Sequence, residues 1–114
     1  TLAATSVKLA KKIEANAIVV LTRSGFTAEL ISSARPRVPV FAFTNNRATQ
    51  NKLSISSSIE NVFLNFSKEH EKTIKNAFTI LKNAYKFKKN HKLIVISGVF
   101  SDIFADAIQI RFVK

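Results

Sequence analysis

The fold is decided by residues 15–46, which read ANAIVVLTRSGFTAELISSARPRVPVFAFTNN. Residues 17–21 and 38–43 are continuous apolar runs rich in β-branched side chains, which is typical of strands covered on both faces. Residues 27–35 between them predict a short helix that ends before Pro36. Because a strand, a helix and a second strand in this order form a right-handed crossover unit, we predict a mostly parallel sheet.

The rest of the chain continues the alternation of helices and strands. Apolar periodicity predicts further helices at about 2–14, 47–53 and 67–87, and further strands at 59–66, 93–96 and 108–113. We expect Asn16 to close the first helix in the left-handed conformation and Ser67 to cap the longest helix. The run 44–46, Thr-Asn-Asn, supplies good caps for the helix that follows it. Residues 99–106 predict either a helical turn or a loop.

These elements predict one α/β domain over residues 1–114. Its architecture is a three-layer α/β/α sandwich with a five-stranded, mostly parallel sheet and an antiparallel last edge strand. The last strand reverses direction because the connection before it is too short for an easy crossover. In that strand Ile108, Ile110 and Phe112 alternate with their neighbours, as expected of a half-exposed strand.

Composition excludes several classes of protein. The chain has no cysteine, which excludes disulfides and thiolate metal sites. No apolar run approaches the roughly 20 residues needed to span a bilayer, so we expect a soluble cytoplasmic protein with no membrane partner. The chain begins at Thr1 and contains no methionine, so we expect it to be processed or excised from something longer.

A net charge of +11 is the strongest compositional signal. Such a charge is typical of proteins that bind nucleic acid or another polyanion. The densest basic group surrounds the end of the longest predicted helix and consists of Lys82, Lys86, Lys88, Lys89 and Lys92. Cations at a helix end complement its dipole, so we favour a solvated surface over a polyanion site and do not expect nucleic acid as a partner.

The turn after the first strand can cradle a phosphate group. It offers N–H groups at a helix N-terminus, the hydroxyl groups of Thr22, Ser24 and Thr27, and the guanidinium of Arg23. The same turn can also be explained by a purely structural role, in which Gly25 supplies an unusual backbone angle, Ser24 caps the helix and no ligand binds. The residues alone leave both interpretations open.

The sequence contains no recognisable catalytic constellation. His70 and His91 are far apart, without an acidic residue at ligand spacing, so we expect surface or cap histidines and no metal site. The sequence has no nucleotide-binding P-loop, in which a glycine-rich turn precedes Lys-Ser or Lys-Thr. No motif indicates a histidine that would activate Ser24 as a nucleophile. We therefore expect no catalytic residue and no cofactor in this chain.

Several of these motifs, in this order and spacing, resemble the C-terminal domain of pyruvate kinase. The resemblance is carried by LTRSGFTA at 21–28, RPRVPV at 35–40 and AFT at 42–44, and it extends to 59–66 and 110–113. It implies a five-stranded mixed sheet whose last strand is reversed. It also implies a regulatory and assembly domain of an enzyme that transfers phosphate from phosphoenolpyruvate to ADP, giving pyruvate and ATP.

The resemblance implies a role for the turn as well. In regulated pyruvate kinases this turn holds a phosphate of a sugar-phosphate activator, and the candidate effector residues are Thr22, Arg23, Ser24, Gly25 and Thr27. Phe26 stands where a basic residue is common. The family's second half-site is poorly matched, because Gly98 is not followed by further glycines and Asp102 and Asp106 would repel a second phosphate. A monophosphate effector, a sugar phosphate or a nucleotide monophosphate, therefore fits better than a bisphosphate.

The same resemblance implies partners. C-terminal domains of the family meet in a homotetramer, partly through their last strands, which makes Ile108, Ile110 and Phe112 candidate interface residues. Catalysis, with magnesium and potassium, belongs to a separate β/α barrel. Such a barrel takes about 250 residues, so the barrel of the same polypeptide is the implied partner and this chain alone should be inactive.

Two other functions remain open from the sequence. One is a stand-alone domain that binds phosphorylated metabolites at the turn. The other is a basic nucleic-acid-binding module, whose affinity would fall steeply with salt because phosphate contacts release counterions.

Overall fold

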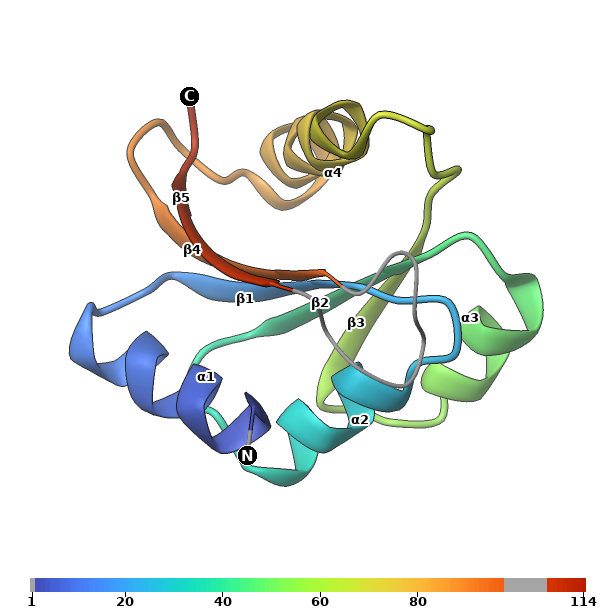
Figure 1. Cartoon of the computed structure of the whole chain (residues 1–114), viewed down its shortest axis with the longest axis horizontal. Helices are drawn as coiled ribbons and strands as arrows, with labels where there is room; N and C mark the ends of the chain where they lie inside the picture. Colours follow the sequence, from blue (N-terminus) through green and yellow to red (C-terminus); the bar gives the residue numbers. More distant parts are fainter. Residues whose placement is uncertain (1, 98–106) are drawn as a thin grey trace.

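One mixed sheet lies between two layers of helices (Figure 1). The computed structural model describes residues 2–97 and 107–114, so the segment 99–106 lies outside the described residues. The strands are β1 (Ala17–Leu21), β2 (Val40–Thr44), β3 (Ile59–Phe63), β4 (Lys92–Ser97) and β5 (Ala107–Phe112). They lie in the order β3-β2-β1-β4-β5, and only the β4–β5 pair is antiparallel. The predicted sheet is confirmed.

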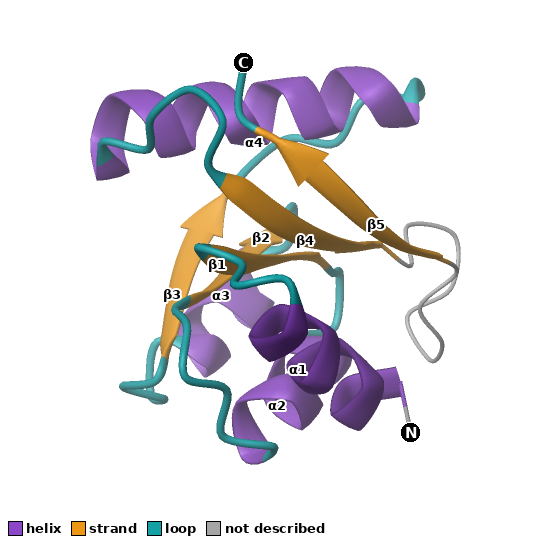
Figure 2. Ribbon diagram, turned by 90° about the vertical axis from the view of Figure 1, so that its left-hand side faces the viewer, coloured by secondary structure: helices purple, strands orange, loops and turns teal. Residues whose placement is uncertain are grey.

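The helices cover the two faces of the sheet unequally. They are α1 (Leu2–Lys12), α2 (Phe26–Ser33), α3 (Arg47–Leu53) and α4 (His70–Tyr85). The first three lie on one face and α4 lies alone on the other, as two perpendicular views show (Figures 1 and 2). This arrangement is the predicted three-layer sandwich. None of the helices in the described part of the chain is long and apolar enough to cross a membrane.

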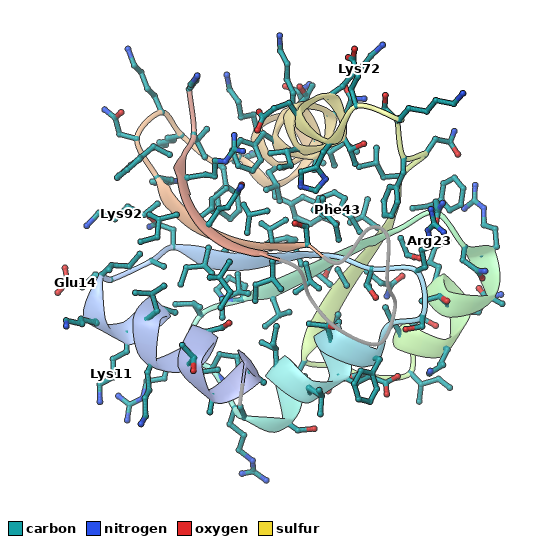
Figure 3. The ribbon with its side chains drawn as sticks, in the orientation of Figure 1. Lys11, Glu14, Arg23, Phe43, Lys72 and Lys92 are labelled. Carbon is teal, nitrogen blue, oxygen red and sulfur yellow. The ribbon has the colours of Figure 1, made fainter. Side chains whose placement is uncertain are left out.

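The core follows from the continuous apolar strands. Every residue of β1 is buried, with alternate side chains directed to opposite faces of the sheet. Ile18 and Val20 join the cluster with α1 and α2, whereas Val19 and Leu21 join the cluster with α4. Phe43 of β2 fills the space between the sheet and α4 (Figure 3). The central strand therefore belongs to both cores.

Two strands are shorter than predicted. β2 begins at Val40 and not at residue 38, because Pro39 has no N–H to donate to a ladder, although its carbonyl accepts from the N–H of Ile18 at 2.9 Å. β3 ends at Phe63 and not at residue 66. Beyond it the chain turns toward α4, where the N–H of Ser67 donates to the hydroxyl of Thr73 at 2.8 Å.

The predicted left-handed cap at Asn16 is wrong. Glu14 has the positive φ, 55°, and two backbone bonds surround it: Ala15 N–H to Ala10 carbonyl at 2.9 Å and Glu14 N–H to Lys11 carbonyl at 3.3 Å. This pattern is a Schellman motif, in which a left-handed residue satisfies the last carbonyls of the helix. Asn16 instead joins β1 to β4, since its side-chain oxygen accepts from the N–H of Lys92 at 2.8 Å.

The two predicted N-caps had different outcomes. The oxygen of the Asn46 side chain accepts from the N–H of Thr49 at 3.0 Å, which confirms a cap from the run 44–46. Ser67 is not the cap of α4, because that helix begins at His70 with Glu69 in the cap position. The Ser67 hydroxyl accepts from the Glu69 N–H at 3.2 Å and so shapes the turn before the helix.

Replacing Glu14 with glycine should stabilise the fold. A non-glycine residue in the left-handed region carries a steric cost that glycine lacks, so Glu14→Gly should raise the free energy of unfolding by roughly 0.5–1 kcal/mol. Urea denaturation measures the change. Glu14→Ala is the control, because it removes the same carboxylate but keeps the Cβ atom. Equal stability of the two variants would contradict the backbone explanation.

Candidate functional site

The candidate site lies where the connections of the sheet diverge. From β1 the chain continues to β2 on one side, whereas from β4 it continues to β5 on the other side. In open α/β sheets this divergence creates a crevice at the carboxyl ends of the strands, where ligands bind. Residues 22–27 follow β1 directly and lie at this end of the sheet, where Figure 3 shows Arg23. The turn that contains Thr22, Arg23, Ser24, Gly25 and Thr27 therefore lies at the ligand-facing end of the sheet, and its role as an effector site stays a prediction.

Side chains of the turn bind its own backbone. The buried hydroxyl of Thr22 accepts from the N–H of Gly25 at 2.9 Å. The hydroxyl of Ser24 accepts from the N–H of Phe26 at 3.2 Å. The next two N–H groups at the start of α2, those of Thr27 and Ala28, have no acceptor among residues 2–97 and 107–114. They are the donors that an anion would meet at the end of this helix.

Two other elements clamp the turn through its carbonyl groups. The carbonyl of Arg23 accepts from the hydroxyl of Thr44, at 3.4 Å, and from that of Thr49 in a short hydrogen bond. The ammonium of Lys52 lies 3.4 Å from the carbonyl of Ser24 and also 3.4 Å from a carboxylate oxygen of Glu29. Both charged side chains are about half exposed, so this ion pair adds little stability.

The sequence did not reveal this clamp. Thr44 carried a usable signal, because it ends the strand next to β1 and carboxyl ends of parallel strands meet at one edge of the sheet. Nothing in the sequence indicated that Thr49 and Lys52 contact the turn, because their approach to it depends on how α3 packs. That packing is set in space and not by a local motif.

Gly25 is required by its surroundings. Its φ is +84°, and a Cβ atom placed on it would lie 3.1 Å from Leu53 Cδ2 and 3.2 Å from Thr49 Cγ2. Both contacts are tighter than ordinary van der Waals distance, and the backbone angle disfavours any other residue. The glycine therefore serves the packing of α3 against the turn. The predicted hydroxyl groups of Thr22 and Ser24 thus have structural roles in the turn, whereas the N–H groups of Thr27 and Ala28 are left for a ligand.

A second candidate surface lies on β5. Ile110 and Phe112 are 46% and 50% exposed, whereas Ile108 is half-buried against the core with α1 and α2. In the described part of the chain β5 pairs with β4 alone, so its other edge has free backbone groups. An open groove of about 1380 Å³ runs between this strand and α4. The candidate interface residues therefore separate into two exposed side chains and one that supports the core.

An ion pair spans the groove between α4 and β5. The guanidinium of Arg111 donates to both carboxylate oxygens of Glu71, at 3.0 Å for one and in a short bond for the other. This pairing lowers the pKa of Glu71 from its usual value and raises that of Arg111. Bidentate geometry of this kind fixes the orientation of both groups.

The described residues offer little to a metal ion. In residues 2–97 and 107–114 no three His, Asp or Glu side chains are grouped closely enough to hold one. The Nδ1 atom of His91 accepts from the N–H of Lys88 at 3.0 Å, within the turn that precedes β4. His70 is half-buried, and its Nδ1 atom has no partner within the same ranges.

A family model described as "Pyruvate kinase, alpha/beta domain" matches residues 1–110. The chain belongs to this family. The predicted resemblance is thereby confirmed, and it covers almost the whole of this chain.

Curated pyruvate kinases are similar to the chain over most of its length. Pyruvate kinase isozyme A of Nicotiana tabacum, named as chloroplastic, is 30% identical over 96 residues, which cover 84% of the chain and 16% of that protein. Plastidial pyruvate kinase 3 of Arabidopsis thaliana is 30% identical over 101 residues, which cover 85% of the chain and 18% of that protein. The chain therefore spans less than a fifth of the length of these relatives.

The pyruvate kinase fold is also found by structural comparison. The crystal structure of Cryptosporidium parvum pyruvate kinase matches 98% of this chain and 21% of its own, with a TM-score of 0.85 and 24% identity. A second crystal structure of a pyruvate kinase from this organism matches with the same TM-score and 26% identity. The mixed sheet and its helices are thus those of pyruvate kinase domains.

Adding a methyl group at Gly25 should destabilise the domain. Gly25→Ala forces an L-residue into the left-handed region and pushes Cβ against Leu53 and Thr49, so we expect a loss of about 1–3 kcal/mol in the free energy of unfolding. Chemical denaturation gives the value. Thr27→Ala, in the same turn but half-buried and without the strained angle, should change stability by less than about 0.5 kcal/mol. A Gly25→Ala variant as stable as the parent would contradict the close-packing account.

Proposed function

We propose that this chain is the regulatory and assembly domain of a pyruvate kinase, which transfers phosphate from phosphoenolpyruvate to ADP. The observation that carries the proposal is the family match over residues 1–110. A catalytic barrel takes about 250 residues, more than twice the 114 present here, so catalysis belongs to another part of such an enzyme. Magnesium and potassium would be held in that other part.

The compartment of the parent enzyme is also a proposal. Composition favours the cytoplasm, whereas several curated relatives are named as chloroplastic or plastidial. We keep the cytoplasm as our proposal on this compositional ground.

Assembly is proposed to use the exposed edge of β5. Ile110 and Phe112 offer an apolar surface beside free backbone groups of β5. The β5 strand of a second copy can pair with these groups, with the two copies related by a two-fold axis. Half-buried Ile108 would support this strand from the core side. A homotetramer of full-length chains would contain this contact between C-terminal domains.

Regulation is proposed to act through the turn after β1. A sugar phosphate or nucleotide monophosphate would accept hydrogen bonds from the N–H groups of Thr27 and Ala28 and would be attracted by the exposed guanidinium of Arg23 in the same turn. Ser24 and Gly25 shape the turn that presents these donors. A free-standing domain that binds phosphorylated metabolites would use the same atoms, so the binding experiment below serves both alternatives.

A charge placed on β5 should weaken self-association. In Ile110→Lys, two ammonium groups would face each other across a symmetric contact, so the dissociation constant should rise at least about tenfold. Analytical ultracentrifugation over a range of concentrations measures it. Ile55→Lys is the matched control, because Ile55 is 86% exposed and lies beyond α3, away from β5. Unchanged association of Ile110→Lys would refute the contact.

Removing the charge of Arg23 should weaken binding of a monophosphate effector. A charge-assisted hydrogen bond contributes about 1.5–3 kcal/mol, so Arg23→Gln should raise the dissociation constant about tenfold or more. Calorimetry with a panel of sugar phosphates and nucleotide monophosphates tests this. Lys68→Gln makes the same change of charge at an exposed position before α4. Binding that neither variant alters, or no binding by the parent chain, would count against the effector site.

A further inference from the structure

A second basic site lies far from the turn in the topology of the sheet. A hollow of about 180 Å³ separates α1 from the segment that joins α2 to β2. Its charged lining consists of Lys8, Lys11, Arg35 and Arg37, and apolar atoms of Val7 and Val38 complete it. Because Val38 precedes β2, the hollow is at the amino end of this strand, whereas the turn after β1 is at the carboxyl ends. The two places therefore cannot share one ligand.

The four cations of the hollow have no acidic partner. In residues 2–97 and 107–114 the ion pairs are Lys52–Glu29 and Arg111–Glu71, and neither involves the hollow. Glu14 lies on the outer edge of the molecule past the end of α1, whereas Lys11 lies below that helix (Figure 3). All four of these side chains are exposed, and together they give this face of the protein a positive potential that favours an anion.

The backbone fixes the two arginines beside the hollow. Arg35 follows the cap of α2 with a φ of +53°, in the left-handed position where glycine is usual. Pro36 then restricts the chain before Arg37. A long cationic side chain thus occupies a position at which the backbone alone favours glycine. The left-handed residue ends α2 and so sets where the chain carrying Arg35 and Arg37 leaves the helix.

The dipole of α1 explains the position of only some of the basic residues around the hollow. Lys11 and Lys12 occupy its last turn, where cations stabilise the helix. Lys12, however, does not line the hollow, and Arg37 belongs to no helix. Lys8 and Lys11 are three residues apart and so share one face of α1, and both line the hollow together with the arginines. The convergence of cations from two separate segments needs a further explanation.

We propose that this hollow binds a phosphate dianion, either free or as the phosphate group of a small metabolite. Guanidinium groups bind phosphate oxygens in pairs, and the two ammonium groups add further donors. A volume of about 180 Å³ is below the range of 300–1,000 Å³ that is usual for larger organic ligands, so it suits a phosphate with at most a few carbon atoms. The proposal does not depend on the effector site at the turn.

The test is a titration of the 114-residue chain with inorganic phosphate at constant ionic strength. Amide resonances in two-dimensional NMR should shift in a saturable manner at residues 35–38 and in the last turns of α1. Arg37→Gln should weaken binding about tenfold, because it removes a charge-assisted contact. Glycerol phosphate forms the second arm: tighter binding than inorganic phosphate assigns the site to an ester, and equal binding assigns it to free phosphate.

A matched pair of variants separates the site from general charge. Arg35→Gly removes a cation and suits the left-handed backbone, so it should weaken phosphate binding without unfolding the protein. Lys86→Gly makes the same change at another left-handed residue, with φ of +61°, at the end of α4. It should leave binding unchanged.

Four results would overturn the proposal. The first is the absence of saturable shifts, and the second is an equal loss in Arg35→Gly and Lys86→Gly. The third is a saturable response confined to residues 22–27, which Arg23→Gln abolishes and Arg37→Gln does not; this result would place the phosphate at the turn. The fourth is salt-sensitive binding of duplex DNA that all the variants weaken equally. This result would indicate a diffuse basic surface and would refute a specific site.

Discussion

The structure depends on the complete burial of β1. This strand pairs with β2 along one edge and β4 along the other, and its side chains enter the cores on both faces of the sheet. A strand without an exposed face must be apolar at every position, which the run from Ala17 to Leu21 satisfies. The first polar residues after it must then emerge at the carboxyl edge of the sheet. The position of the turn, and so of the candidate site, follows from this constraint.

The sequence predicted the layers and strand types well, because continuous apolar runs respond to burial, a strong and local signal. It failed where a helix end is chosen by packing. Asn16 has the better intrinsic preference for a left-handed cap, yet Glu14 occupies that position, because the buried Ala10 and Ala15 set where α1 can end. The turn itself could be predicted from its glycine and hydroxyl residues. Thr49 and Lys52 could not, because only the packing of α3 brings them to it.

The turn and the basic hollow represent two ways of presenting positive potential. At the turn the donors are N–H groups whose positions are fixed by the packing of Gly25 against α3. In the hollow they would be long, exposed side chains from two segments, whose combined positive potential favours an anion. The first arrangement is rigid and set by the fold, whereas the second is adaptable. A net charge of +11 therefore conceals two distinct local environments.

The order of the strands has a consequence for how the chain acquires its structure. Asn16 and Lys92 are joined by two hydrogen bonds although 76 residues separate them, so β1 reaches its second neighbour only when β4 has been synthesised. Until then, the most apolar strand of the protein has an open edge toward solvent, a common starting point for aggregation. The nascent domain passes through this vulnerable stage with α4 already made. Lysine residues concentrated on α4 and the segment after it, among the last parts of the chain to emerge, supply charge that opposes association of such intermediates.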